Sequence, residues 1–172
     1  SGLMGVAKTE EMFVFLKDQF KTRKVLKEYT ALAYGRIERE EGEITVPLKK
    51  GPGRTIVKPR GAQREKGVLE AITRFEVLDH FQHYTLVKVF LHTGRTHQIR
   101  AHFYAYNHSL VGDKKYCHRQ YRTRTAFTRF VKSDRVFLHA SRLVFMDRNG
   151  EMREYTSPLP EELQGFLETI SR

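Results

Sequence analysis

Residues 91–102 read L-H-T-G-R-T-H-Q-I-R-A-H, and this stretch decides how the rest of the chain is interpreted. It follows an apolar run over residues 84–91 that predicts a strand, and Gly94 permits a turn that other residues resist. A helix is expected over residues 96–106 with Thr96 as its N-cap, so that the positive end of the helix dipole faces outward. The corner between strand and helix carries four polar donors: Arg95, His97, Gln98 and Arg100. The pattern indicates a site for an anion or a polar base, and a solvated basic helix start is the alternative interpretation.

Composition narrows the class of protein. The 172 residues are 40% hydrophobic and include 12 Phe and 8 Tyr, which suffices for one folded domain with a core. Lys and Arg total 31 against 20 Asp and Glu, and the net charge of +11 predicts a polyanionic partner, most commonly nucleic acid. A membrane surface is disfavoured because there is no long apolar run and no basic amphipathic helix. The single cysteine, Cys117, provides no disulfide framework, and we expect a cytoplasmic monomer.

Periodicity predicts the elements around this corner. Thr9 is expected to cap a helix whose core face is formed by Met12, Phe13, Leu16 and Phe20. A closing helix is expected after residues 158–160. The order of elements predicts an α+β fold in one domain, residues 1–172, with a twisted, mixed but mostly antiparallel sheet and flanking helices. Strands are expected at residues 1–8, 27–35, 44–48, 68–78, 84–91, 136–145 and 151–157, the last two joined by a turn at Asn149-Gly150.

A basic stretch, residues 49–66, reads K-K-G-P-G-R-T-I-V-K-P-R-G-A-Q-R-E-K. Its glycines and prolines predict a long exposed hairpin or loop, and its cations would meet RNA phosphates without choosing a sequence. A flexible solvated loop is an equally good interpretation. A second basic stretch with interleaved aromatic residues, residues 118–135, is another candidate RNA-facing surface. The candidate phosphate contacts in the first stretch are Lys49, Lys50, Arg54, Lys58 and Arg60.

The string at residues 91–102 resembles motif III of the RluA family of pseudouridine synthases, L-x-T-G-R-T-H-Q-I-R-x-H. Further segments resemble the same family along nearly the whole chain. Residues 1–9, S-G-L-M-G-V-A-K-T, are similar to the end of motif II, and residues 27–32, K-E-Y-T-A-L, to the tyrosine motif. The segments G-D-K-K-Y at 112–116 and F-L-H-A-S-R-L-V-F at 137–145 are similar to two later family elements.

The resemblance implies roles for particular residues. Tyr29 would be the active-site tyrosine, and Arg100 would pair with the catalytic aspartate. Leu138 would help to line the uracil pocket. In the family, that aspartate lies in H-R-L-D-x-x-T-S-G, four positions before Ser1, and it is absent from this sequence. Asp113 is interpreted as a structural residue that shapes a turn. The residues expected to hold RNA beside this centre are Lys27, Arg95, Thr96, His97 and Gln98.

The resemblance therefore implies an isomerase that converts uridine to pseudouridine in structured RNA, either rRNA or tRNA, provided that a preceding segment supplies the aspartate. We expect the domain to be incomplete at its N-terminus. The alternative is a non-catalytic RNA-binding domain that retains the scaffold without the nucleophile. The chemistry needs no cofactor, and the histidine and cysteine spacings do not favour a metal site: His97 and His102 are five residues apart, and Cys117-His118 has no matching pair.

Overall fold

The computed structural model of the chain describes residues 1–122 and 135–170. Within them, α1 spans Glu10–Lys21, α2 spans Gln98–Ala105 and α4 spans Glu161–Thr169, with short 3-10 turns η1 at Ala62–Arg64 and η2 at Arg119–Tyr121. The strands are β1 (Leu26–Tyr34), β2 (Glu41–Ile44), β3 (Leu48–Lys50), β4 (Thr55–Val57), β5 (Val68–Leu69), β6 (Thr73–Phe81), β7 (Tyr84–Leu91), β8 (Leu138–Met146) and β9 (Met152–Thr156).

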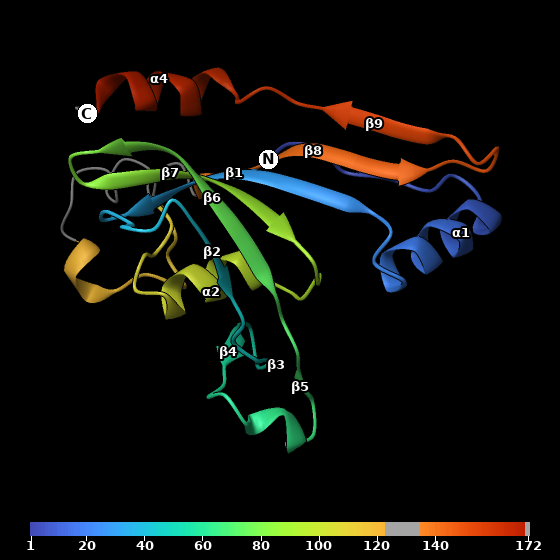
Figure 1. Ribbon diagram of the computed structural model, residues 1–172, viewed down its shortest axis with the longest axis horizontal. Helices are drawn as coiled ribbons and strands as arrows, with labels where there is room; N and C mark the ends of the chain where they lie inside the picture. Colours follow the sequence, from blue (N-terminus) through green and yellow to red (C-terminus); the bar gives the residue numbers. More distant parts are fainter. Residues whose placement is uncertain (123–134, 171–172) are drawn as a thin grey trace.

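Two sheets organise these strands. The larger has six strands in the order β2-β6-β7-β1-β8-β9, and all its strand pairs are antiparallel. The smaller has the order β4-β3-β5 and projects from the body of the domain (Figure 1). The expected α+β fold with a mostly antiparallel sheet and flanking helices is confirmed, and within the described residues parallel pairing is restricted to an isolated bridge between Gly2 and Ala140.

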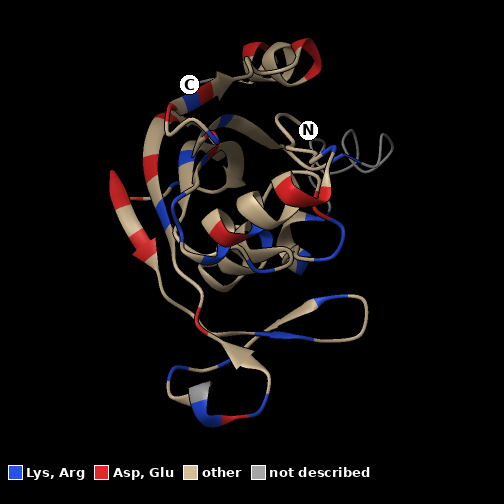
Figure 2. Ribbon diagram, turned by 90° about the vertical axis from the view of Figure 1, so that its right-hand side faces the viewer, with Lys and Arg blue, Asp and Glu red and all other residues tan. Residues whose placement is uncertain are grey.

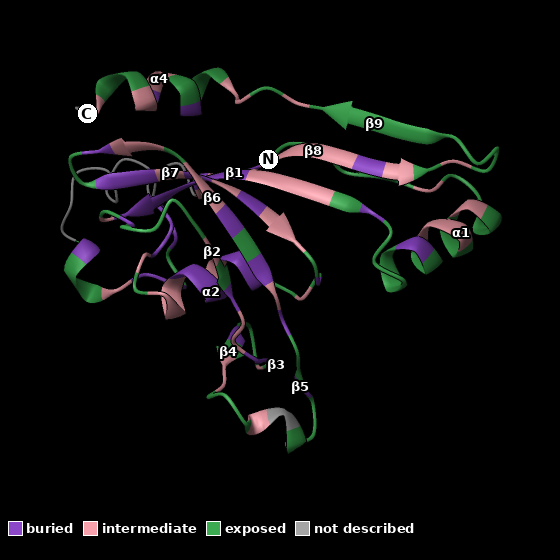
Figure 3. Cartoon of the chain, viewed as in Figure 1, coloured by how far each residue is buried: buried purple, intermediate pink, exposed green. Residues whose placement is uncertain are grey.

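Strand β1 is central because helices cover both of its faces. Leu32 and Tyr34 belong to the core cluster that contains Leu163 and Phe166 of α4. Ala31 and Ala33 belong to the cluster on the opposite face, with two residues of α2. Figure 1 shows α4 on one side of the large sheet and α2 on the other. The predicted half-buried alternation at 29–34 therefore becomes burial on both faces from residue 30 onward (Figure 3).

Several expected boundaries are wrong. Residues 1–8 form no strand beyond the bridge at Gly2. The strand expected at 44–48 is interrupted at residues 45–47, where Pro47 cannot donate to a ladder, and its ends belong to different sheets. The strand expected at 68–78 is likewise divided into β5 and β6. Asn149-Gly150 does form the turn between β8 and β9, with φ of 82° at Gly150.

Helix α1 begins as predicted but packs differently. The Thr9 hydroxyl accepts a hydrogen bond from the Met12 amide at 3.2 Å, which confirms the N-cap. The predicted core face is contradicted, since Phe13 is 50% exposed and Phe20 is 47% exposed. The apolar stripe instead lines an open groove of about 660 Å³ between α1 and strands β8 and β9. The only buried residue of α1 is Gln19, whose amide bonds both backbone groups of Met146 at 2.8 and 2.9 Å.

Candidate functional site

Arg100 is held by a buried carboxylate on a neighbouring loop. Its Nε and Nη2 atoms donate to the two oxygens of Asp113 at 2.6 and 2.7 Å. Asp113 is fully buried, and its Oδ1 also accepts from the amides of Lys115 and Tyr116, both at 2.9 Å. These two amide bonds are consistent with the predicted turn-shaping role of Asp113. The bidentate pair fixes the guanidinium plane, and the Arg100 side chain remains 19% exposed.

The start of α2 is fixed by a buried amide. Gln98 is 2% exposed; its Oε1 accepts from the Thr93 hydroxyl and the Arg95 amide, and its Nε2 donates to Ile72 and Thr73. The prediction that Gln98 contacts RNA is therefore wrong, because every hydrogen-bonding group of this side chain is used internally. No local pattern in this basic string indicates that Gln98 points inward.

Helix α2 also begins later than predicted. Its N-cap is His97, in the left-handed conformation with φ of 53°, and no side chain caps the helix. Thr96 is therefore not the N-cap, and its carbonyl instead accepts from the Thr55 hydroxyl of β4 at 2.6 Å. Arg95 donates from Nε to the Glu70 carbonyl at 3.2 Å. These bonds tie the corner to the small sheet and leave the His97 ring beside Tyr116, with its Nδ1 at 3.2 Å from the phenol oxygen.

Tyr29 and Leu138 lie on the face of the large sheet that α2 covers. Both are partly buried and pack against the cluster that includes Ile99, the neighbour of Arg100. Tyr29 pairs with Ala140 of β8, two residues from Leu138. Burial raises the pKa of the Tyr29 phenol above its usual value of 10, so the hydroxyl stays protonated at neutral pH. The two predicted residues thus share one surface with the start of α2.

The first residues of the chain lie along β8 beside Leu138. The Ser1 ammonium donates to the Leu138 carbonyl at 3.3 Å, and the Ala140 amide donates to the Ser1 carbonyl at 2.9 Å. The Ser1 hydroxyl lies 3.0 Å from Nδ1 of His139, and Gly2 packs so closely on Ala140 that a Cβ would lie 2.2 Å from its carbonyl oxygen. This contact explains the need for glycine after Ser1.

The basic stretch forms most of the small sheet and its loops, where Lys and Arg gather (Figure 2). Lys49 and Lys58 lie 3.8 and 2.7 Å from Glu65, which offsets part of their charge. The predicted RNA contacts in this stretch that remain exposed are Lys50, Arg54 and Arg60.

Lys27 lies apart from this sheet, at the start of β1. Its Nζ is 5.5 Å from the centre of the Phe20 ring, and burial lowers the pKa of this amine below 10.5. The second basic stretch falls largely on residues 123–134, outside the described residues.

Sequence reasoning missed the residues that hold the site in place. The pattern around Asp113 predicts a turn residue, and nothing in its spacing identifies it as the partner of Arg100, thirteen positions earlier. Tyr116 and Thr55 were also missed, although Tyr116 was visible in the G-D-K-K-Y segment. Among the described residues, no group of three or more His, Cys, Asp or Glu side chains is arranged to hold a metal ion, and no helix could cross a membrane.

Comparison with known proteins identifies the family to which this arrangement belongs. The family description "RNA pseudouridylate synthase" matches residues 1–105, which include β1, β6, β7 and the whole of α2. The chain belongs to the RNA pseudouridylate synthase family. The resemblance to the RluA type is confirmed, and sequence similarity to curated synthases extends beyond the matched residues.

Curated synthases match the chain over its whole length. It is 33% identical over 179 residues to ribosomal large subunit pseudouridine synthase D of Buchnera aphidicola, with 100% of this chain and 54% of the relative covered. It is 34% identical over 173 residues to the uncharacterized RNA pseudouridine synthase YlyB of Bacillus subtilis, with 100% of this chain and 53% of the relative covered. The chain therefore spans about half the length of these synthases.

Solved structures agree on the fold. Human RNA pseudouridylate synthase domain containing 1 superposes with a TM-score of 0.73 at 27% identity, covering 90% of this chain and 63% of that one. Human RNA pseudouridylate synthase domain containing 4 also superposes with a TM-score of 0.73, at 20% identity, and covers 93% of this chain and 67% of that one. At this identity the likeness supports the synthase fold alone.

Proposed function

We propose that this chain is the larger part of an RNA pseudouridine synthase domain, in which Arg100 holds the nucleophilic carboxylate and Tyr29 contacts the target base. The observation that carries the proposal is the geometry of Arg100. Asp113 occupies Nε and one N–H of Nη2, so the Nη1 edge of a fixed and partly exposed guanidinium is left for a second carboxylate. A fixed Arg fork suits a carboxylate better than a mobile lysine would.

The reaction is an isomerisation and needs no redox partner. The bond between N1 and C1′ of the uridine breaks, the base turns over, C5 bonds to C1′, and the proton on C5 is finally lost while N1 gains one. A carboxylate near C1′ assists these steps, and the base must leave its stack. Tyr29, kept protonated by burial, provides a flat apolar surface and a hydroxyl beside the base. Leu138 adds apolar surface to the same pocket.

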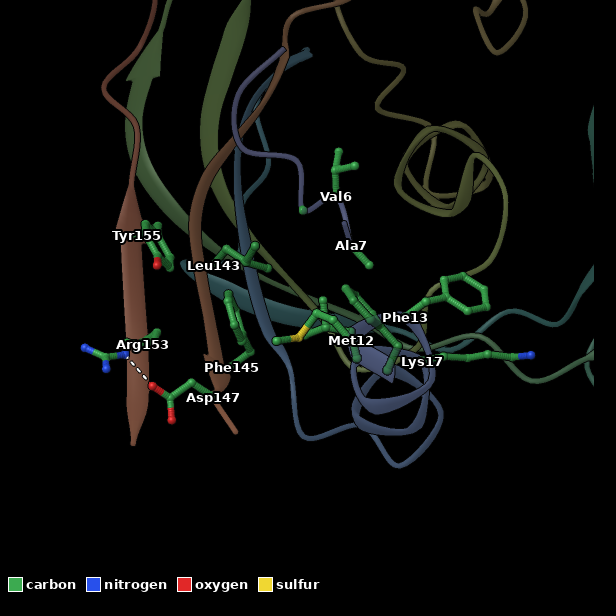
Figure 4. Close-up of a pocket in the computed structure, with 13 residues that line it drawn as sticks. Val6, Ala7, Met12, Phe13, Lys17, Leu143, Phe145, Asp147, Arg153 and Tyr155 are labelled. Atoms are coloured by element: carbon green, nitrogen blue, oxygen red, sulfur yellow. Dashed lines mark hydrogen bonds and ion pairs between the residues drawn. The ribbon is translucent and has the colours of Figure 1, made fainter. Parts of the chain in front are cut away.

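We further propose that polypeptide preceding Ser1 supplies the aspartate. Ser1 lies against Leu138, and an aspartate four positions earlier would be within about 14 Å of it when fully extended. The apolar groove supports additional polypeptide, because its lining includes Met12 of α1, which points toward Phe145 of β8, and Leu143 of the same strand (Figure 4). All five residues of β9, at the sheet edge, are exposed. The relatives of about twice this length are consistent with such a segment.

The proposed substrate is structured RNA, held through phosphates by the cations of the small sheet. The relatives named ribosomal large subunit pseudouridine synthases favour rRNA over tRNA. A monomer in the cytoplasm is part of the same proposal.

The test uses the complete coding frame with large-subunit rRNA labelled with tritium at C5 of uridine, because each isomerisation releases that label. The expected result is release by the wild-type protein and a loss of more than about tenfold for Arg100→Ala. Arg148→Ala is the matched control, since Arg148 is an exposed arginine in the turn between β8 and β9 that pairs with Glu11 of α1. An Arg100→Ala rate within tenfold of the control would contradict the assigned role.

The coding sequence before Ser1 provides a separate test of the nucleophile. An H-R-L-D-x-x-T segment there supports the proposal, and conversion of its aspartate to asparagine should abolish release. Unrelated sequence at that position would leave the site without a carboxylate at C1′ and would favour an RNA-binding relative instead.

A further inference from the structure

Tyr116 joins three parts of the candidate site although its side chain is fully buried. The Thr55 amide of β4 donates to its phenol oxygen at 2.6 Å, and Nδ1 of His97 lies 3.2 Å from the same oxygen. The Arg100 and Arg54 guanidinium carbons lie 5.2 and 5.5 Å from the centre of its ring. The phenol is therefore the point at which the small sheet meets α2.

The hydrogens at this junction can be assigned from donor and acceptor chemistry. A backbone N–H can only donate, so the phenol oxygen accepts from Thr55, and its own hydrogen needs an acceptor. Nδ1 of His97 is the acceptor within reach. If Nδ1 carried a hydrogen instead, two donors would meet one oxygen and the phenol hydrogen would be buried unpaired, at a cost of about 1–3 kcal/mol. His97 is therefore the tautomer with its hydrogen on Nε2.

The surroundings also keep His97 neutral. Burial, followed by the positive charges of Arg100 and Lys115, lowers its pKa below 6.5, and Asp113 opposes this only in part. A protonated ring would again leave the phenol hydrogen without an acceptor. The left-handed backbone, with φ of 53°, turns the ring toward Tyr116, with the two rings 5.6 Å apart and nearly perpendicular at 71°.

We propose that Tyr116 is a positioning residue that fixes His97 as a neutral Nε2–H donor to a phosphate oxygen of the bound RNA. The ring of His97 is partly exposed, and cations surround it: Arg54 lies over Tyr116, and Lys115 reaches the neighbouring hairpin through the Gly53 carbonyl at 3.0 Å. A phosphate drawn in by these cations meets a donor of fixed direction. The inference rests on the proposed RNA-modifying function, because it names a contact made by that site.

The first experiment reads the tautomer directly in the free chain. Two-bond nitrogen–proton spectra of the ¹⁵N-labelled protein at pH 7.5 distinguish protonated from unprotonated ring nitrogens. We expect Nδ1 of His97 to be unprotonated, and Tyr116→Phe to mix the two tautomers. Tyr104→Phe is the matched control, since Tyr104 stacks on His118 with ring centres 4.2 Å apart and should leave His97 unchanged. A hydrogen on Nδ1 in the wild-type chain overturns the inference and leaves the proposed function intact.

The second experiment measures affinity for a large-subunit rRNA transcript as salt is raised. His97→Asn tolerates the left-handed backbone but cannot place a donor at the Nε2 position. We expect this variant to weaken binding by roughly ten- to a hundredfold, the value of a hydrogen bond to a charged group. The salt slope, meaning the slope of the logarithm of the binding constant against the logarithm of the salt concentration, should not change. Arg54→Ala should reduce that slope by about 0.7–0.9, because it removes one phosphate-neutralising charge.

The outcomes are distinguishable. Binding by His97→Asn within twofold of wild type, or a salt slope reduced as in Arg54→Ala, overturns the phosphate contact. Failure of the wild-type chain to bind the transcript at low salt overturns the proposed RNA partner, whereas the tautomer is read without RNA. Because His97→Asn leaves the Thr55–Tyr116 bond in place, the test holds even if Tyr116→Phe does not fold.

Discussion

Replacement of Asp113 by asparagine should destabilise the domain strongly. The carboxylate accepts four hydrogen bonds, two from Arg100 and one each from the amides of Lys115 and Tyr116, and it is fully buried. Asparagine is almost isosteric but retains one acceptor oxygen, so its NH₂ group would face either the Nε of Arg100 or the amides of the turn. Both arrangements place donors against donors and leave the guanidinium without its counter-charge.

The magnitude follows from the burial of the pair. Removal of one partner of a buried ion pair costs about 3–5 kcal/mol, and the 19% exposure of Arg100 points to the lower end of that range. For a chain of this size, about 3 kcal/mol corresponds to a decrease in Tm of roughly 6–12 °C. Urea denaturation followed by circular dichroism gives the free energy of unfolding directly.

The matched control is Asp147→Asn. Asp147 also accepts from two amides, those of Asn149 and Glu151, and from an arginine, Arg153, but it lies at an exposed hairpin turn. Its replacement should cost clearly less than that of Asp113, because water can satisfy the groups that are released. If Asp113→Asn lost less than about 1 kcal/mol, or no more than the control, burial of the Arg100 pair would not be the stabilising feature inferred here.

Three further predictions test other parts of the structure. Burial lowers the pKa of His102 below 6.5, so its stabilising contribution is present above pH 6.5 and is lost as the pH falls toward the folded-state value. The unfolding free energy, measured in urea, should therefore decline by up to about 1.4 kcal/mol per pH unit in acid. If His102→Asn showed the same dependence of unfolding free energy on pH, the prediction would be contradicted. Gly2→Ala would place a Cβ on a residue with φ of 96° and against the Ala140 carbonyl. Hydrogen exchange at the Leu3 amide should therefore accelerate roughly 5- to 30-fold, the equivalent of about 1–2 kcal/mol. Unchanged protection would show that the bridge between Gly2 and Ala140 does not persist in solution. Phe13→Asp should lower the unfolding free energy of this chain by less than about 1 kcal/mol, because Phe13 is 50% exposed. In the longer protein the loss should be about 1.5–3 kcal/mol if added polypeptide covers the groove. Equal losses in urea denaturation of the two proteins would argue that the groove stays open.

The sequence was most informative where local pattern and tertiary packing agree. The positions of β1, of the strand before the motif and of the turn at Gly150 follow from local residues, and the structure confirms them, whereas the half-buried alternation predicted for β1 is replaced by burial on both faces. The family motif added roles for Tyr29 and Arg100 that periodicity cannot provide, and these remain predictions. Composition also indicated a polyanionic partner, because charge is additive along the chain.

The remainder depended on contacts between distant segments. The Arg100–Asp113 pair joins a helix to a loop thirteen residues later, and no periodic pattern encodes that distance. The inward orientation of Gln98 depends on partners in β6, which lies 25 residues earlier. The apolar residues of α1 have the spacing of a core face, yet Phe13 and Phe20 are exposed. Spacing identifies the apolar face of a helix but does not show which segment, if any, covers that face.

The polar residues of the motif therefore divide by helical face. Gln98 and His102, four positions apart, point inward and both bond the Thr73 hydroxyl, at 2.9 Å each. The Thr73 hydroxyl accepts from Gln98 and donates to Nδ1 of His102. The Nε2–H of His102 donates to the Val46 carbonyl, so the position of each hydrogen in this network is determined. His97 and Arg100, three positions apart, lie on the other side against Tyr116 and Asp113. The buried face fixes where α2 begins, and because the helix is rigid, it also fixes where the two groups proposed to meet RNA and the carboxylate are presented. A loss of activity in a Gln98 or His102 variant would accordingly reflect displacement of His97 and Arg100, and the tautomer of His97 would report that displacement before any RNA is added.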